Sequence, residues 1–307
     1  MSGVVLALAC GTSGRRGDTI GQTQYTEPIL NLRLVGSYGP VFSDRITLIG
    51  PSGVTVNRIG EILVSDRSAN SVYKFSPQFE IISDEGGIGA APGTFNRPVG
   101  LDCDQALNVY VADSGNRRIQ VLDRSLYYVG TIDSYFDLND ESSKFSQPED
   151  IRIDREGNFW IADNDRVLKL DPFNELLQEL SYDVAVDFGI GRVSSIDISG
   201  SDLLAIGDRG NKQVIIATIN GNHISDFAAG SPSCVAWDDK GLLWVADDIA
   251  GRLEVFDIDG NSRFRHAEAV SEFRPSWITF DQSGRLIMLD SGRRKIYVYE
   301  VIRGIQR

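Results

Sequence analysis

One sequence unit recurs six times along this chain and constrains the fold more than any other feature. Each unit has an apolar segment, a polar or glycine-containing turn, a second apolar segment ending in aspartate, another short turn and a third apolar segment. The units begin at Pro51, Pro98, Pro148, Val193, Pro232 and Pro275. The aspartates recur every 39 to 50 residues, at Asp66, Asp113, Asp163, Asp208, Asp247 and Asp290. A period of this length indicates a fold assembled from repeated supersecondary units.

The segments of each unit have the pattern of short β-strands. Apolar and polar residues alternate, and Val, Ile, Tyr, Phe and Trp are abundant, as expected of half-buried strands. Glycines at the breaks, for example Gly157, Gly241 and Gly284, suit tight hairpin turns. Six units of four short antiparallel strands predict an all-β fold, a six-bladed β-propeller whose blades pack radially.

The last unit ends after its third strand, so its fourth strand has to come from elsewhere. Residues 29–37, with the sequence ILNLRLVGS, precede the first unit and alternate apolar and polar side chains. We expect this segment to be the outer strand of the last blade, which closes the ring and removes an unpaired sheet edge. The predicted organisation is a propeller over residues 29–307, preceded by a signal-like or tether-like segment over residues 1–28.

The second unit carries a family resemblance. Residues 95–123, FNRPVGLDCDQALNVYVADSGNRRIQVLD, resemble an NHL repeat, and the resemblance extends over residues 47–307, with the fourth unit the weakest. The resemblance implies one of several activities, because NHL-like propellers include protein-binding platforms, RNA-binding modules, amidating lyases and lactonase-like enzymes. The fold does not choose among these functions, so the site residues must.

The charge of the chain bears on its partners. Acidic residues outnumber basic ones by 43 to 30, which gives a net charge of −13. Such a surface repels the phosphate backbone whose capture supplies most of the affinity for nucleic acids, and its field opposes anionic lipid head groups. We therefore expect a protein partner and no nucleic acid.

Few residues could support catalysis. The two histidines, His223 and His266, are expected in loops away from the axis, which argues against the zinc site of the amidating lyases and against a Ser-His-Asp triad. Lactonase-like propellers hold an axial divalent ion, and here only Glu149 and Asp150 offer carboxylates at the start of an inner strand. The preferred interpretation is a non-catalytic protein without cofactor or metal. The alternative is a lactonase-like hydrolase with a weakly held axial metal.

The repeated aspartates are interpreted as structural hinge residues. Each has a cationic residue close in sequence, which suits an Asx-type turn and an ion pair between neighbouring blades. If these turns share one face, that face carries an arginine-rich rim that can bind carboxylates through paired hydrogen bonds. The predicted protein-binding rim consists of Arg67, Arg117, Arg118, Arg209, Arg252, Arg293 and Arg294. Tyr127, Tyr128, Tyr135 and Phe136 form a second candidate anchor, an aromatic loop between the second and third blades.

The N-terminus suggests a location. Residues 1–9, MSGVVLALA, lead into Cys10 and a polar, glycine-rich stretch, which resembles the end of a bacterial lipoprotein signal and its tether. The apolar run is short and no Lys or Arg precedes it, so either a longer signal lies upstream or the resemblance is accidental. We expect Cys10 to be lipidated and the propeller to lie in the bacterial periplasm or cell envelope, as a scaffold or accessory subunit of a membrane-associated complex.

Overall fold

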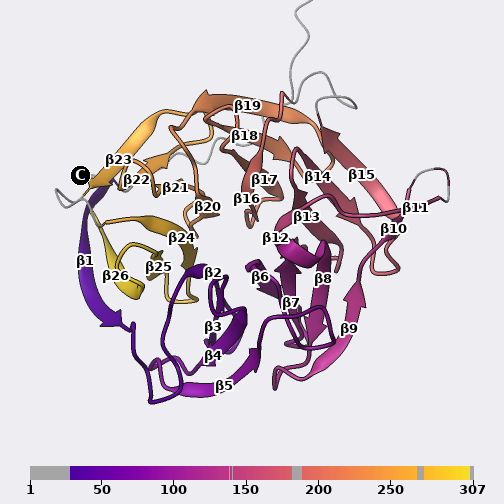
Figure 1. The fold of residues 1–307 in the computed structure, drawn as a ribbon. Coiled ribbons are helices and arrows are strands. Elements are labelled where there is room, and N and C mark those ends of the chain that lie inside the picture. Colours follow the sequence, from indigo (N-terminus) through magenta and orange to yellow (C-terminus); the bar gives the residue numbers. More distant parts are fainter. Residues whose placement is uncertain (1–27, 138, 140, 182–188, 268–272, 305–307) are drawn as a thin grey trace, which may run out of the picture.

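The computed structural model describes residues 28–304 apart from 138, 140, 182–188 and 268–272. Within these ranges the strands form six four-stranded sheets, arranged as blades around a central axis (Figure 1), and one additional two-stranded sheet. This arrangement confirms the predicted all-β, six-bladed propeller. The described helical structure is limited to the 3-10 turn η1 (Ser114–Asn116). No helix in these ranges is long and apolar enough to cross a membrane.

The strands of each blade are ordered from the axis outward. The innermost strands are β2 (Pro51–Val56), β6 (Pro98–Cys103), β12 (Pro148–Ile153), β16 (Val193–Ile198), β20 (Cys234–Trp237) and β24 (Pro275–Phe280). The second strands are β3 (Ile62–Asp66), β7 (Val109–Asp113), β13 (Phe159–Asp163), β17 (Leu203–Asp208), β21 (Leu243–Asp247) and β25 (Leu286–Asp290). The third strands are β4 (Ser71–Phe75), β8 (Arg118–Leu122), β14 (Arg166–Leu170), β18 (Gln213–Thr218), β22 (Arg252–Phe256) and β26 (Lys295–Arg303). The outermost strands are β5 (Ile81–Gly86), β9 (Tyr128–Ile132), β15 (Leu176–Ser181), β19 (His223–Ala228), β23 (Ser262–Ala267) and β1 (Ile29–Tyr38), and the small sheet pairs β10 (Tyr135–Phe136) with β11 (Ser142–Ser143).

The hydrophobic core lies between the blades. Second strands such as β3, β13 and β21 are buried at every position, because both of their faces meet a neighbouring blade. The outer strand β23 instead has exposed or half-buried residues throughout. Trp160 of the third blade, for example, is fully buried among residues of the fourth blade that include Ile196 and Ile206. Burial of such side chains, at about 25 cal/mol per Å² of apolar surface, is the main stabilising contribution to this fold.

The ring closes as the sequence predicts. β1 pairs antiparallel with β26, with Leu34 opposite Tyr299, so the N-terminal strand completes the sixth blade. Arg33 also forms an ion pair with Glu300 across these two strands. The end of β1 then contacts the first blade, because the Tyr38 ring stacks on Phe79 with centroids 3.9 Å apart. Both contacts join residues distant in sequence and leave no unpaired strand at the seam.

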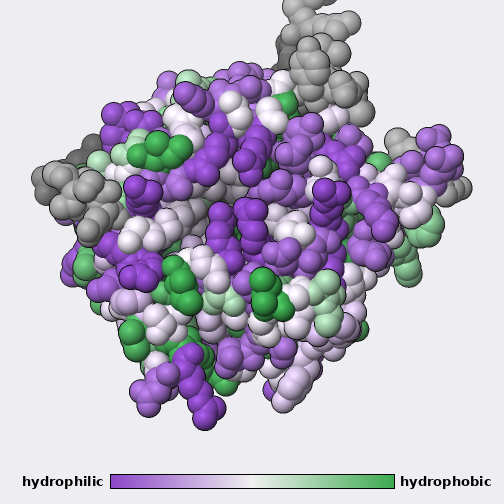
Figure 2. Space-filling model, viewed as in Figure 1, coloured by the Kyte–Doolittle hydropathy of each residue, from purple (hydrophilic) through white to green (hydrophobic). Residues whose placement is uncertain are grey.

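The antiparallel order of the strands gives the ring two distinct ends. We call the end at which the innermost strands begin, and at which the turns after the hinge aspartates lie, the mouth face; the other end is the far face. On the face shown in Figure 2, hydrophilic residues surround the middle of the ring, and apolar residues form separate patches nearer its edge.

Candidate binding site at the axial mouth

The hinge aspartates fix the backbone of the mouth face. Asp66 accepts hydrogen bonds from the amides of Ile49 and Gly50, which lead into the first blade, and from those of Ser68 and Ala69 in the turn after β3. Equivalent bonds to the connection before the innermost strand occur at the other five hinge aspartates. Each carboxylate therefore ties two segments of the mouth together.

The ion pairs of these aspartates correct one expectation. Asp113 pairs with Arg118 at 2.8 Å, and Asp163 pairs with Arg166 at 2.8 Å. Both arginines lie on the third strand of the same blade, directly opposite the aspartate. The predicted pairing between neighbouring blades is therefore wrong for these residues, because the register within the blade already places a guanidinium beside the carboxylate.

The predicted arginine rim divides into three groups. The first group is engaged by the hinge aspartates of its own blades: Arg118, Arg252 and Arg293. Arg117 and Arg294 are exposed and hold left-handed turn positions, with φ of 56° and 55°. Only Arg67 and Arg209 of the seven line a hollow at the axis.

This hollow, the axial mouth, has a volume of about 170 Å³. The charged residues that line it are Arg67, Arg97, Arg192, Arg209, Glu149 and Asp248. Arg97 and Arg192 were not predicted as site residues. Each immediately precedes an innermost strand, a repeat position that also holds Arg274, so aligning the six unit starts could have revealed them.

Two of the four mouth arginines already have carboxylate partners. Arg192 pairs with Glu149 at 3.0 Å, and Arg209 forms an ion pair with Asp248 of the next blade. The guanidiniums of Arg67 and Arg97 form no hydrogen bond or ion pair with any residue that the structure describes. Burial lowers the pKa of Arg67, and Arg97 and Arg209 act in the same direction, whereas Glu149 and Asp248 oppose it. The mouth thus has more cationic groups than its own acids neutralise.

Serines at the starts of innermost strands hold adjacent blades together around the mouth. Ser52 donates to the carbonyl of Pro98 at 2.8 Å, and Ser194 and Ser233 make the same contact to the next blade. These bonds hold the rim of the mouth in place, since each links the first residues of two neighbouring innermost strands.

A different cluster lies on the innermost strands below the mouth, in the part of the ring that we call the channel. Arg152 lies between Asp150, at 2.7 Å, and Asp197, at 3.2 Å. Asp102 also acts electrostatically on Arg152, and together these four residues form what we call the channel cluster. Burial raises the pKa of Asp150 to about 7 and raises those of Asp102 and Asp197, while Arg152 opposes all three shifts.

The carboxylates of the channel cluster also bind backbone of the following blade. Asp102 accepts from the amide of Ile153 at 3.0 Å, and Asp150 accepts from the amide of Ile196 at 3.0 Å. Asp197 accepts from the amide of Trp237 at 2.7 Å. The innermost strands have no strand on their axial side, so these side chains satisfy amides that would otherwise be buried without partners.

The two weak metal candidates of the sequence are separated by this arrangement. Glu149 lies at the mouth and pairs with Arg192, whereas Asp150 lies in the channel and pairs with Arg152. Within the described ranges, no group of three or more His, Cys, Asp or Glu side chains is placed to hold a metal ion.

The histidines and cysteines, which could act as metal ligands or nucleophiles, lie away from the mouth or are buried. His223 and His266 belong to the outer strands β19 and β23, so their predicted placement in loops was wrong, although they do lie far from the axis in the blade order. Burial raises the pKa of the Cys234 thiol to about 12 and that of Cys103 well above its usual range. Both thiols are therefore protonated at neutral pH. Cys10 lies outside the described residues.

The aromatic loop separates into a buried and an exposed part. Tyr135 is buried against Phe145, with ring centroids 5.5 Å apart. Tyr127 and Phe136 remain exposed by 69% and 50%, so they can contact a partner.

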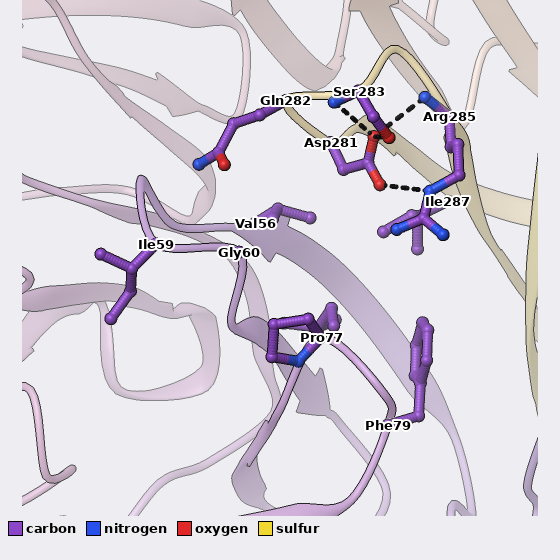
Figure 3. Close-up of a pocket in the computed structure, with 11 residues that line it drawn as sticks. Val56, Ile59, Gly60, Pro77, Phe79, Asp281, Gln282, Ser283, Arg285 and Ile287 are labelled. Carbon is purple, nitrogen blue, oxygen red and sulfur yellow. Dashed lines mark hydrogen bonds and ion pairs between the residues drawn. The ribbon is translucent and has the colours of Figure 1, made fainter.

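A larger hollow of about 350 Å³ lies on the far face, between the first and sixth blades (Figure 3). Val56, Ile59 and Pro77 contribute its apolar wall. Its charged groups neutralise each other, because Asp281 accepts from Arg285 at 2.7 Å. This hollow offers shape without unpaired charge, which makes the axial mouth the stronger candidate site.

Comparison with known proteins supports the repeat assignment. The NHL repeat family matches residues 95–122, which cover the first three strands of the second blade. NHL repeat-containing protein 3 of Homo sapiens is 29% identical over 122 residues, or 39% of this chain and 28% of that protein. The mouse protein of the same name is 27% identical over 181 residues, or 58% of this chain and 49% of that protein. The matched region thus spans about half or less of these relatives.

Solved structures share the fold at low sequence identity. A gluconolactonase from Xanthomonas campestris superposes with a TM-score of 0.66 and 15% identity, covering 90% of this chain and 95% of that one. An inactive virginiamycin B lyase from Staphylococcus aureus superposes with a TM-score of 0.64 and 15% identity, covering 89% and 88% of the two chains. At such identities the likeness concerns the fold alone. Together with the closed ring of six blades, these findings show a six-bladed β-propeller that contains an NHL repeat in its second blade.

Proposed function

We propose that this propeller is a non-catalytic binding module that holds a protein partner on its mouth face. The observation that carries this proposal is the axial mouth, where four guanidiniums meet two carboxylates and two of the guanidiniums have no partner among the described residues. Arginine is well suited to protein interfaces because its planar fork recognises carboxylates and is weakly hydrated.

The charge pattern favours a protein over a nucleic acid. Glu149 and Asp248 stand among the mouth arginines, and the chain as a whole carries a charge of −13. A phosphate backbone would meet repulsion around a small cationic hollow. A protein can instead present a single acidic group to that hollow and neutral groups to its surroundings.

The state of the ionisable groups favours binding over catalysis. A general acid or base has to reach its substrate, whereas Asp102, Asp150 and Asp197 are engaged by backbone amides and by Arg152. Nucleophilic catalysis by cysteine needs the thiolate, and burial keeps Cys103 and Cys234 in the thiol form.

Site-specific photocrosslinking in the source cells tests this proposal. A benzoylphenylalanine in place of Ile249, which is 76% exposed in the turn after β21, probes the mouth face. The same residue in place of Phe173, which is 79% exposed in the hairpin between β14 and β15, probes the far face. We expect a discrete crosslinked partner only from position 249. Crosslinks from position 173 alone would contradict the proposal and favour the far face as the binding surface.

The proposal includes the cell-envelope location expected from Cys10. A lipid on this residue would tether the propeller to a membrane and leave the ring free to serve as an accessory subunit of a membrane complex. Metabolic labelling with an alkyne fatty acid is expected to mark the wild-type protein and not the Cys10→Ser variant. Equal labelling of both would contradict lipidation at this cysteine.

A further inference from the structure

We infer that the axial mouth is a carboxylate pocket that receives an acidic side chain from a segment of the partner protein. This inference deepens the proposed function and depends on it for the source of the ligand. Four arginines and two acids line the mouth, so its side chains carry a net charge of about +2. An excess of positive charge in a hollow attracts and holds an anion more strongly than the same charge on a flat surface.

The two unpartnered arginines come from segments that the fold holds in place. Arg67 directly follows the buried hinge residue Asp66, which fixes the turn through the amides of Ser68 and Ala69. Arg97 has a left-handed backbone, with φ of 57°, and its amide donates to Asn70 of the preceding blade at 2.9 Å. A left-handed backbone is unfavourable for a non-glycine residue, so the surrounding contacts, not the preference of the residue, determine this conformation.

A neutral donor on the wall of the mouth also has no partner. Trp277 lines the pocket and is 2% exposed. Its indole N–H is buried and forms no hydrogen bond with the described protein atoms. Buried donors are usually matched by an acceptor, so Trp277 leaves an unsatisfied polar group beside the mouth.

The size of the mouth limits the ligand. A volume of about 170 Å³ is close to the roughly 150 Å³ cavity known to admit benzene. The pocket therefore accommodates the end of an Asp or Glu side chain, and the rest of the partner would lie outside it on the mouth face.

The acids of the mouth select carboxylate over phosphate. Arg192 with Glu149 and Arg209 with Asp248 already show guanidinium–carboxylate pairing within this pocket. A phosphate group concentrates up to about two negative charges on a single centre, next to these two carboxylates. A carboxylate carries one charge and can be held by a guanidinium fork through two parallel hydrogen bonds.

Calorimetric titration of the purified protein with hexaglutamate and with hexaglutamine tests this inference. We expect hexaglutamate to bind and hexaglutamine not to bind. The variant R67Q/R97Q removes the two unpartnered guanidiniums and is expected to bind hexaglutamate at least tenfold more weakly. The matched control R124Q/R155Q removes two exposed arginines from turns of the far face and should bind like the wild type, and melting curves establish that both variants are folded.

Several outcomes would overturn the inference. Equal affinity of R67Q/R97Q and the wild type would show that the ligand lies elsewhere. Equal weakening in R124Q/R155Q would show that only the overall charge matters. If glutarate bound as tightly as hexaglutamate, the pocket would be assigned to a small dicarboxylate instead of a protein segment. If inorganic phosphate bound more tightly than hexaglutamate, the assignment of a carboxylate ligand would be contradicted.

The crosslinking experiment separates this inference from the proposed function. If crosslinks from position 249 persist in R67Q/R97Q while hexaglutamate fails to bind, the partner uses the mouth face without the pocket and the inference fails alone. If hexaglutamate binds as expected and position 249 yields no crosslink, the pocket is real and the proposed protein partner is wrong.

Discussion

The axial mouth and the channel below it are built from the same innermost strands but use charge in opposite ways. In the channel, three carboxylates surround Arg152 and are engaged by it or by amides of the next blade. In the mouth, arginines outnumber acids, and Arg67 and Arg97 have no partner among the residues described. Buried charges with all their partners in place hold a fold together, whereas charges in a hollow without partners are available to a ligand. We therefore expect changes in the channel to alter stability and changes in the mouth to alter binding.

The largest effect is expected from Arg152→Met. This substitution leaves Asp102, Asp150 and Asp197 in the channel without their shared cation. Removing one partner of a buried ion pair typically lowers the free energy of unfolding by about 3–5 kcal/mol. Urea denaturation would measure the loss. If the variant were as stable as the wild type, the channel cluster would not have the structural role that we assign to it.

Asp113→Ala should have a smaller effect on stability. The aspartate accepts from the amide of Asn96 at 2.7 Å and pairs with Arg118, and leaving buried donors unsatisfied costs about 1–3 kcal/mol. Denaturation measured alongside hexaglutamate titration should show lower stability with binding retained. Unchanged stability together with lost binding would show that this hinge aspartate takes part in ligand binding. It would contradict the division between structural residues and binding residues.

The channel cluster should also make stability depend on pH. Burial raises the pKa of Asp150 to about 7, above its usual value of about 3.9 in an unfolded chain. Between these values the folded protein holds a proton that the unfolded chain has released, so the free energy of unfolding falls as pH rises from about 4 to about 7. Asp150→Asn cannot titrate and should lose this part of the slope. If the free energy of unfolding depended on pH in the same way in the wild type and in Asp150→Asn, the raised pKa of Asp150 would be contradicted.

The smallest effect on stability is expected from Arg67→Gln and Arg97→Gln. Neither guanidinium contacts a described partner, so each change should alter the free energy of unfolding by no more than about 0.5 kcal/mol. Urea denaturation of each single variant checks this value. A loss of 2 kcal/mol or more would mean that the mouth, like the channel, is a structural element.

Sequence patterns predicted the fold more completely than the site. The repeat and the leftover segment at residues 29–37 specified six blades and the closing strand, because strand alternation and an unpaired edge are local signals with one global solution. The site depends on which side chains meet across blades, and that is not local. Arg67 and Arg209 were expected on a rim, whereas Arg97 and Arg192 immediately precede innermost strands, and an alignment of the unit starts was the one sequence signal that could have pointed to them. Asp150 was weighed as a metal ligand, yet its partner Arg152, two residues along the same strand, turns toward it in the channel.

The central claim, that the arginines of the mouth bind a ligand and do not stabilise the fold, is tested most directly by one set of melting curves. The wild type and R67Q/R97Q are melted with and without excess hexaglutamate. Without the peptide we predict the same melting temperature for both, and with it a rise in the wild type alone, because a ligand stabilises only the state that binds it. A lower melting temperature of the variant without peptide, or an equal rise in both proteins with it, would contradict the account.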